Sequence, residues 1–155
     1  MWPDFRVVVC LSTRGIGISP DEQLPTSCHS FSLQETLDIS DNSLTGTLST
    51  EFALMNRLQN LIIDGNELKG RLEQILDCGE CSSTMVRFRS RHNPLEGSIP
   101  ERLFEFSQLT AFQISRSDIS GTISTELGLL TTLQSLDLSL NPFFVPGTTI
   151  PTELG

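Results

Sequence analysis

The chain has 155 residues, a net charge of −9, no tyrosine and one tryptophan. Its length suits one domain, and its acidic balance excludes a general nucleic-acid-binding protein, which needs a basic surface. No apolar run approaches the roughly 20 residues that a membrane-spanning helix requires, so we expect no membrane insertion by this segment.

Residues 1–30 carry the weakest pattern of the chain. Val7, Val9 and Leu11 alternate with their neighbours as in a strand, and residues 15–20 are similar to the later part of the repeats described next. The first eleven residues contain an acid and lack both a basic start and a small-residue cleavage site, so we interpret them as a buried strand rather than a signal peptide. We expect residues 1–30 to form a degenerate repeat or an N-terminal cap.

Residues 31–155 follow one recurring template, LxxLxLxxNxLxGxI. Its copies start at positions 34, 58, 85, 109 and 133, so the spacings are 24, 27, 24 and 24 residues. Offsets below are counted from these starts. Self-similarity at such a period is typical of stacked-repeat proteins, in which one repeat cannot bury its apolar face alone but several neighbours can.

Each L-x-L unit predicts a short strand with both apolar side chains on one side, and the rest of the repeat closes the coil as short helical turns or extended segments. The asparagine at offset 8 carries two donors and an acceptor, so we expect it to bond backbone groups of adjacent turns that would otherwise be buried and unpaired. Repeat four has Ser117 there, which should do this less well. The asparagines are Asn42, Asn66, Asn93 and Asn141.

The repeats resemble the leucine-rich repeat family. Residues 97–101 (GSIPE) and 121–128 (GTISTELG) are similar to the GxIPxELG segment of the plant-type subclass, which occurs in plant receptor kinases, receptor-like proteins and polygalacturonase inhibitors, with similar repeats in algae and diatoms. The resemblance implies an α/β leucine-rich-repeat solenoid with a short-strand parallel sheet on its concave face and irregular or short helical convex segments. It implies about five repeats over residues 31–155, the last one truncated.

The four cysteines form two pairs in the sequence. The resemblance implies that Cys10 and Cys28 could pair in an N-terminal cap. Cys78 and Cys81 lie in the three-residue insertion of repeat two. A thioredoxin-type redox site would need a βαβ unit, and a zinc site would need two further ligands. A structural role, as a disulfide or as two free thiols, is therefore favoured, and we expect no metal and no cofactor.

Basic residues gather in repeat three, at the offsets 2, 4, 6 and 7 that face solvent in this family. Their mutual repulsion requires a compensating charge, which a carboxylate, sulfate or phosphate on a partner would provide. The R-x-R spacing also resembles an element with which some plant peptide-hormone receptors hold a peptide's C-terminal carboxylate. The alternative is internal pairing with Asp64, the expected lateral neighbour of Arg91, together with screening by solvent. The candidate ligand-binding residues are Arg87, Arg89, Arg91, His92, Arg116, Gln113 and Asp64.

The sequence contains no catalytic constellation. Its two histidines, His29 and His92, are far apart in the repeat register, and no nucleotide-binding, metalloprotease or hydrolase motif is present. We therefore expect a protein- or peptide-binding module rather than an enzyme, as a fragment of a cell-surface receptor-like protein. The alternatives are a soluble inhibitor or scaffold, a cytoplasmic location, or a truncated array without independent function.

Overall fold

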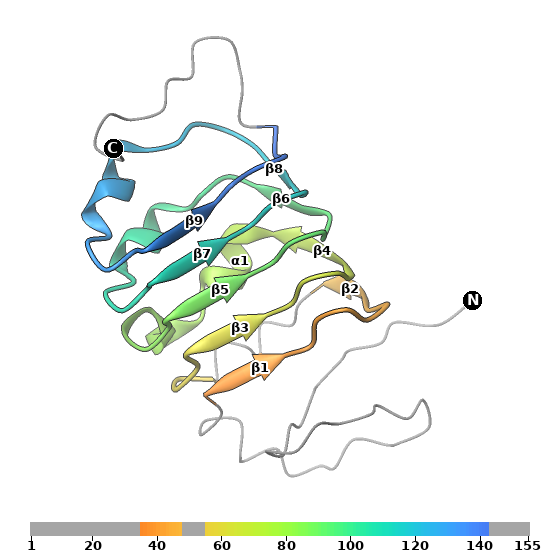
Figure 1. The fold of residues 1–155 in the computed structure, drawn as a ribbon, viewed down its shortest axis with the longest axis horizontal. Helices are drawn as coiled ribbons and strands as arrows, with labels where there is room; N and C mark the ends of the chain where they lie inside the picture. The colour runs from red at the N-terminus through yellow and green to blue at the C-terminus, as the bar shows by residue number, and fades with distance from the viewer. Residues whose placement is uncertain (1–34, 48–54, 143–155) are drawn as a thin grey trace.

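The computed structural model describes residues 35–47 and 55–142. The strand of each repeat lies beside the strand of the next in one parallel sheet, in sequence order (Figure 1). The register is continuous, so the apolar residues at offset 3 form one row, running from Leu37 to Leu136. The strands are β1 (Thr36–Asp38), β3 (Asn60–Ile62), β5 (Arg87–Arg89), β7 (Ala111–Gln113) and β9 (Ser135–Asp137). This arrangement confirms the predicted leucine-rich-repeat solenoid.

In repeats one to four, the strand of the first sheet is followed along the chain by a strand of a second, four-stranded parallel sheet. The sequence pattern did not predict this second sheet. Its order is β2 (Thr45–Thr47), β4 (Glu67–Arg71), β6 (Leu95–Gly97) and β8 (Asp118–Ile119). The glycine at offset 12 allows the chain to bend here. Gly97 has a φ of 100°, and a Cβ atom at this position would lie 2.8 Å from Oε2 of Glu73, so a larger residue would meet both backbone strain and a clash.

The outer halves of repeats two, three and four contain short helices, as predicted. They are α1 (Leu72–Leu76) and the 3₁₀ helices η3 (Gly79–Ser83), η4 (Glu101–Glu105) and η5 (Thr125–Leu129). Leu72, Leu103 and Leu127 from these helices are buried in the core. Between the helices and the first sheet, the rings of Phe88 and Phe112 stack with centroids 5.4 Å apart, so adjacent repeats interlock through large apolar side chains.

The asparagines at offset 8 connect neighbouring repeats. The side-chain nitrogen of Asn93 donates to the carbonyl of Ile63 at 2.7 Å, and its oxygen accepts from the amide of Leu68 at 3.0 Å. Asn66 bonds Ile39 and Leu44 in the same way. Both partners lie in the preceding repeat, so each asparagine satisfies two of its backbone groups at the turn. Asn141 forms the corresponding pair of bonds with repeat four, whereas Asn42 bonds carbonyls of its own turn.

Ser117 interrupts this series. It occupies the asparagine position of repeat four and is buried, but its hydroxyl has no hydrogen-bond partner. An asparagine side chain at position 117 would accept a hydrogen bond from the backbone amide of Leu95. This amide instead donates to the carbonyl of Asn93, in its own repeat, at 2.8 Å. The contact between repeats three and four therefore lacks the asparagine bridge that joins the other described neighbours.

Candidate ligand-binding face

The side of the first sheet that points away from the core is called the concave face below. It is formed by the residues at offsets 2 and 4, which lie on the strands, and at offsets 6 and 7, which follow them. β5 contributes Arg87 and Arg89 to this face, and Arg91 and His92 lie two and three residues beyond the end of the strand. Arg87 lies in register between Asn60 and Ala111 of the adjacent strands. The arginines of repeat three therefore occupy the middle of a five-stranded surface.

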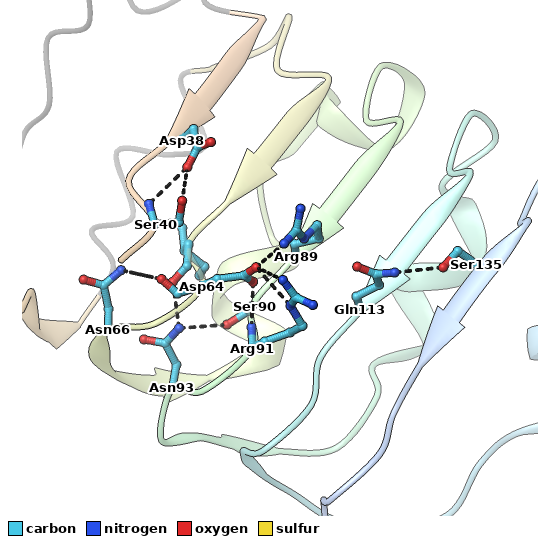
Figure 2. A network of polar contacts seen from close by, with 11 residues as sticks. Asp38, Ser40, Asp64, Asn66, Arg89, Ser90, Arg91, Asn93, Gln113 and Ser135 are labelled. Atoms are coloured by element: carbon cyan, nitrogen blue, oxygen red, sulfur yellow. Dashed lines mark hydrogen bonds and ion pairs between the residues drawn. The ribbon is translucent and has the colours of Figure 1, made fainter. Parts of the chain in front are cut away.

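Asp64 binds two of these arginines at once. Its Oδ2 accepts hydrogen bonds from Nη2 of Arg89 and from Nε and Nη2 of Arg91, the latter two at 3.0 and 2.8 Å. Its Oδ1 accepts from the backbone amide of Arg91 at 2.9 Å. Figure 2 shows the carboxylate lying between the two guanidinium groups. One carboxylate thus serves two cations, and the cluster keeps a net positive charge.

The burial of Asp64 corrects one expectation. The residue was predicted to face solvent at offset 6, but it is only 6% exposed. Its two arginine partners keep side-chain exposures of 28% and 42%. Burial by itself would raise the pKa of Asp64, but the hydrogen bonds from Arg91 and the charges of Arg89 and Arg91 outweigh it and hold this pKa below its ordinary value. The carboxylate therefore stays ionised at neutral pH.

Arg87 differs from the two arginines that follow it. Its side chain is exposed and forms no ion pair or hydrogen bond with any residue that the structure describes. Beside it lies the short side chain of Ala111, which leaves the guanidinium uncovered on that side. Arg87 is therefore the strand arginine that is free to contact an external anion.

His92 and Arg116 occupy equivalent positions at offset 7 of adjacent repeats, and both are exposed. Their φ values of 58° and 53° are left-handed. The residues at the same offset in the other repeats, Asp41, Gly65 and Leu140, also have positive φ. The chain turns off each strand at this point, so His92 and Arg116 lie at the edge of the face. His92 follows Arg87 by five residues in the chain, and Arg116 has the same offset in the next repeat.

Two aspartates at offset 4, Asp38 and Asp137, flank the arginines and were not among the candidates named from the sequence. Oδ1 of Asp38 accepts from the amide and hydroxyl of Ser40, and Oδ1 of Asp137 accepts from those of Ser139 at 3.0 and 2.7 Å. The hydrogen bond from the Ser139 hydroxyl is the main cause that lowers the pKa of Asp137. The available signal was the sequence Asp-x-Ser at the same offsets in repeats one and five.

Gln113, another candidate, fills the row between Arg89 and Asp137. Its Nε2 donates to the hydroxyl of Ser135 at 2.8 Å (Figure 2). The side-chain oxygen remains available as an acceptor. Gln113 is therefore held in place at the face while keeping one polar group for a ligand.

The cysteines lie away from this face. Cys78 and Cys81 form a disulfide, with Cα atoms 5.5 Å apart, and both are buried around η3. Cys10 and Cys28 lie outside the described residues. Within residues 35–47 and 55–142, no group of three or more His, Cys, Asp or Glu side chains is placed to hold a metal ion. The helices of the same ranges are all too short or too polar to cross a bilayer.

Comparison with known proteins identifies the repeats. The family model described as Leucine Rich Repeat matches residues 35–55. The chain is 38% identical over 79 residues to the leucine-rich repeat receptor protein kinase MSP1 of Oryza sativa subsp. japonica, covering 50% of this chain and 6% of that protein. It is 34% identical over 123 residues to receptor-like protein 41 of Arabidopsis thaliana, covering 79% and 11%.

A solved structure supports the same assignment. The fold superimposes on the leucine-rich-repeat ectodomain of the Arabidopsis receptor kinase HAESA, in complex with an N-terminally extended IDA peptide hormone, with a TM-score of 0.68 and 25% identity. This match covers 77% of the chain and 19% of HAESA, so the chain spans less than a fifth of each of these three proteins. The chain belongs to the leucine-rich repeat family, and its curated relatives are plant receptor kinases and receptor-like proteins.

Proposed function

We propose that the chain is a binding module of a cell-surface receptor-like protein, and that a peptide or protein ligand lies across its concave face. Arg87 makes the main contact with an anionic group of this ligand, and Gln113, His92 and Arg116 extend the surface. The observation that carries the proposal is the exposed guanidinium of Arg87 in the middle of the face, with no carboxylate partner among the described residues.

The excess positive charge of repeat three explains why an anion is the expected contact. Arg87, Arg89 and Arg91 follow one another on one strand side, and among the described residues only Asp64 forms ion pairs with them. Same-side neighbours on a strand are about 6.6–6.8 Å apart, so the unneutralised charges repel. A carboxylate on the ligand relieves this repulsion and can bind a guanidinium through two parallel hydrogen bonds. We therefore favour binding over catalysis as the role of the arginines.

Two further observations support a cell-surface location. The relatives include a receptor kinase and a receptor-like protein, and the HAESA ectodomain holds a peptide hormone. The Cys78–Cys81 disulfide fits the same location, because disulfides persist in oxidising compartments and are rare in the cytosol.

The test begins with selection of ligands from a displayed library of random linear peptides. A length of about 12 residues is enough to cross all five strands. Selected peptides are then measured by fluorescence anisotropy against the wild-type chain, Arg87→Ala and Arg57→Ala. Arg57 is the matched control, because it is exposed, lies in the turn before β3 and forms no ion pair with a residue that the structure describes.

We expect Arg87→Ala to weaken binding at least about tenfold, with the loss reduced at high salt because screening already weakens the contact. Arg57→Ala should bind as the wild type does. If both variants bind like the wild type, Arg87 is not the anion contact. If folded wild-type chain selects no peptide, the peptide-binding role is wrong.

A further inference from the structure

One row of the concave face alternates in charge. Its members are Asp38, Ile62, Arg89, Gln113 and Asp137, and the strand register places them side by side across the whole sheet. The two ends of the row are acidic and the middle is basic. Arg87 and Arg91 flank Arg89 on the same strand side, so they strengthen the positive middle, from which Asp64 removes only one charge.

The acidic ends keep their charge available. Asp38 and Asp137 each accept hydrogen bonds from a serine two residues further on, and neither forms an ion pair in the part of the chain that the structure describes. The Ser139 hydroxyl lowers the pKa of Asp137, so this end stays ionised at neutral pH. The face therefore offers negative, positive and negative groups in order along the solenoid axis.

The spacing of these groups matches an extended peptide. Adjacent strands lie about 4.8 Å apart, so two strand steps separate Arg89 from each aspartate by about 10 Å. An extended peptide in the polyproline II form rises about 3.1 Å per residue and has three residues per turn, so every third side chain faces the same way. Three peptide residues therefore span the distance from one charged position to the next.

The geometry points to a ligand segment that crosses the strands in the polyproline II form and carries one acidic residue with a basic residue three positions away on each side. This inference rests on the proposed function and specifies its ligand. A purely acidic segment would meet repulsion at Asp38 and Asp137, and a purely basic one would meet it at the arginines. Such like-charge contacts are a common source of discrimination between partners.

Two displayed peptide libraries test the inference, equal in length and random at all other positions. One fixes the order Lys-x-x-Glu-x-x-Lys, and the other fixes Glu-x-x-Lys-x-x-Glu. After equal rounds of selection on the folded wild-type chain, we expect at least tenfold greater enrichment of the first library. A fully random library is selected in parallel, so that binding by the face is measured independently of the fixed charges.

Charge reversal of the flanking aspartates supplies the second arm. The variant Asp38→Lys/Asp137→Lys should lose the preference for the first library. The control Glu67→Lys/Asp118→Lys changes the net charge equally, but its residues are exposed on the second sheet, and it should keep the preference. Loss of the preference in both variants would attribute it to net charge and overturn the inference.

The remaining outcomes separate this inference from the proposed function. Equal enrichment of both libraries, or a preference for the second, overturns the charge order. If Arg87→Ala still weakens the binding of the selected peptides, the proposed binding at the concave face holds even though the charge order is wrong. Failure of all three libraries on folded chain contradicts the proposed function and this inference together.

Discussion

Arg91 binds the carboxylate of Asp64 in the preceding repeat through both its backbone amide, at 2.9 Å, and its guanidinium, at 2.8 and 3.0 Å. This contact fixes the turn after β5 against the turn after β3. Arg89 shares the same carboxylate. One buried side chain therefore both joins two repeats and sets how much positive charge the concave face presents.

Replacing Asp64 should cost stability while strengthening anion binding. Asp64→Asn keeps the shape but leaves two guanidinium groups without their counter-charge, so we expect a loss of about 1–3 kcal/mol in the free energy of unfolding, measured by urea titration. The same variant should bind acidic peptides more tightly than the wild type does. Asp38→Asn, at an exposed position, is the control and should change stability by less than about 0.5 kcal/mol. Equal stability of the two variants would contradict the role of Asp64.

The stability of the chain should fall in acid, partly through Asp64. The folded chain holds the pKa of Asp64 below its ordinary value, so near this pKa the unfolded chain binds more protons, and stability rises with pH. The contribution is complete above the unfolded pKa of about 3.9 and is lost as pH falls through the lower folded pKa. Urea titrations between about pH 5 and 3 should show a shallower decline for Asp64→Asn than for the wild type. Parallel declines would show that Asp64 is not involved.

Restoring the missing asparagine should stabilise the repeat array. Ser117→Asn places an amide where it can accept from Leu95 and donate to a carbonyl of repeat three, as Asn93 does for Leu68 and Ile63. We expect a gain of about 1 kcal/mol in the free energy of unfolding from the added hydrogen bonds. The matched change Asn93→Ser should cost about 1–3 kcal/mol, because it leaves buried backbone groups unpaired. A loss of stability in Ser117→Asn would mean that the site cannot accommodate the larger side chain.

The disulfide should hold the inserted residues of repeat two in place. It closes a four-residue loop from Cys78 to Cys81, for which the loss of unfolded-chain entropy predicts about 2 kcal/mol of stabilisation. A reducing agent should therefore lower the thermal midpoint of the wild type more than that of Cys78→Ala/Cys81→Ala. Peptide mapping by mass spectrometry, with alkylation before and after reduction, checks the pairing directly. Alkylation of both thiols in the native, unreduced protein would contradict it.

The main features of the fold were predictable because its apolar period is local. Residues such as Leu61 and Phe88 recur at fixed offsets, so strands and core follow from the sequence alone. The second sheet was not predictable in this way, since burial of Leu68 and Leu95 says nothing about which backbone groups pair. The burial of Asp64 also escaped prediction, because it depends on Arg89 and Arg91 both reaching back to the preceding strand.

The acidic flanks were missed for a different reason. Asp38 and Asp137 are four repeats apart, and each looks like an ordinary surface acid when considered alone. Their significance depends on the register that places both in the row of Arg89. The repeated Asp-x-Ser sequence was visible, but its place relative to the arginines becomes clear only when the strands are aligned.

A double-mutant cycle between Arg87 and the acidic residue of a selected peptide tests the central claim most directly. The four dissociation constants come from wild type and Arg87→Ala, each measured with the peptide and with its Glu→Gln form at one salt concentration. The account predicts a coupling energy of about 1.5 kcal/mol or more, as found for close charge pairs across interfaces. Additive effects, with a coupling within about 0.5 kcal/mol of zero, would contradict a direct contact between Arg87 and the ligand's carboxylate.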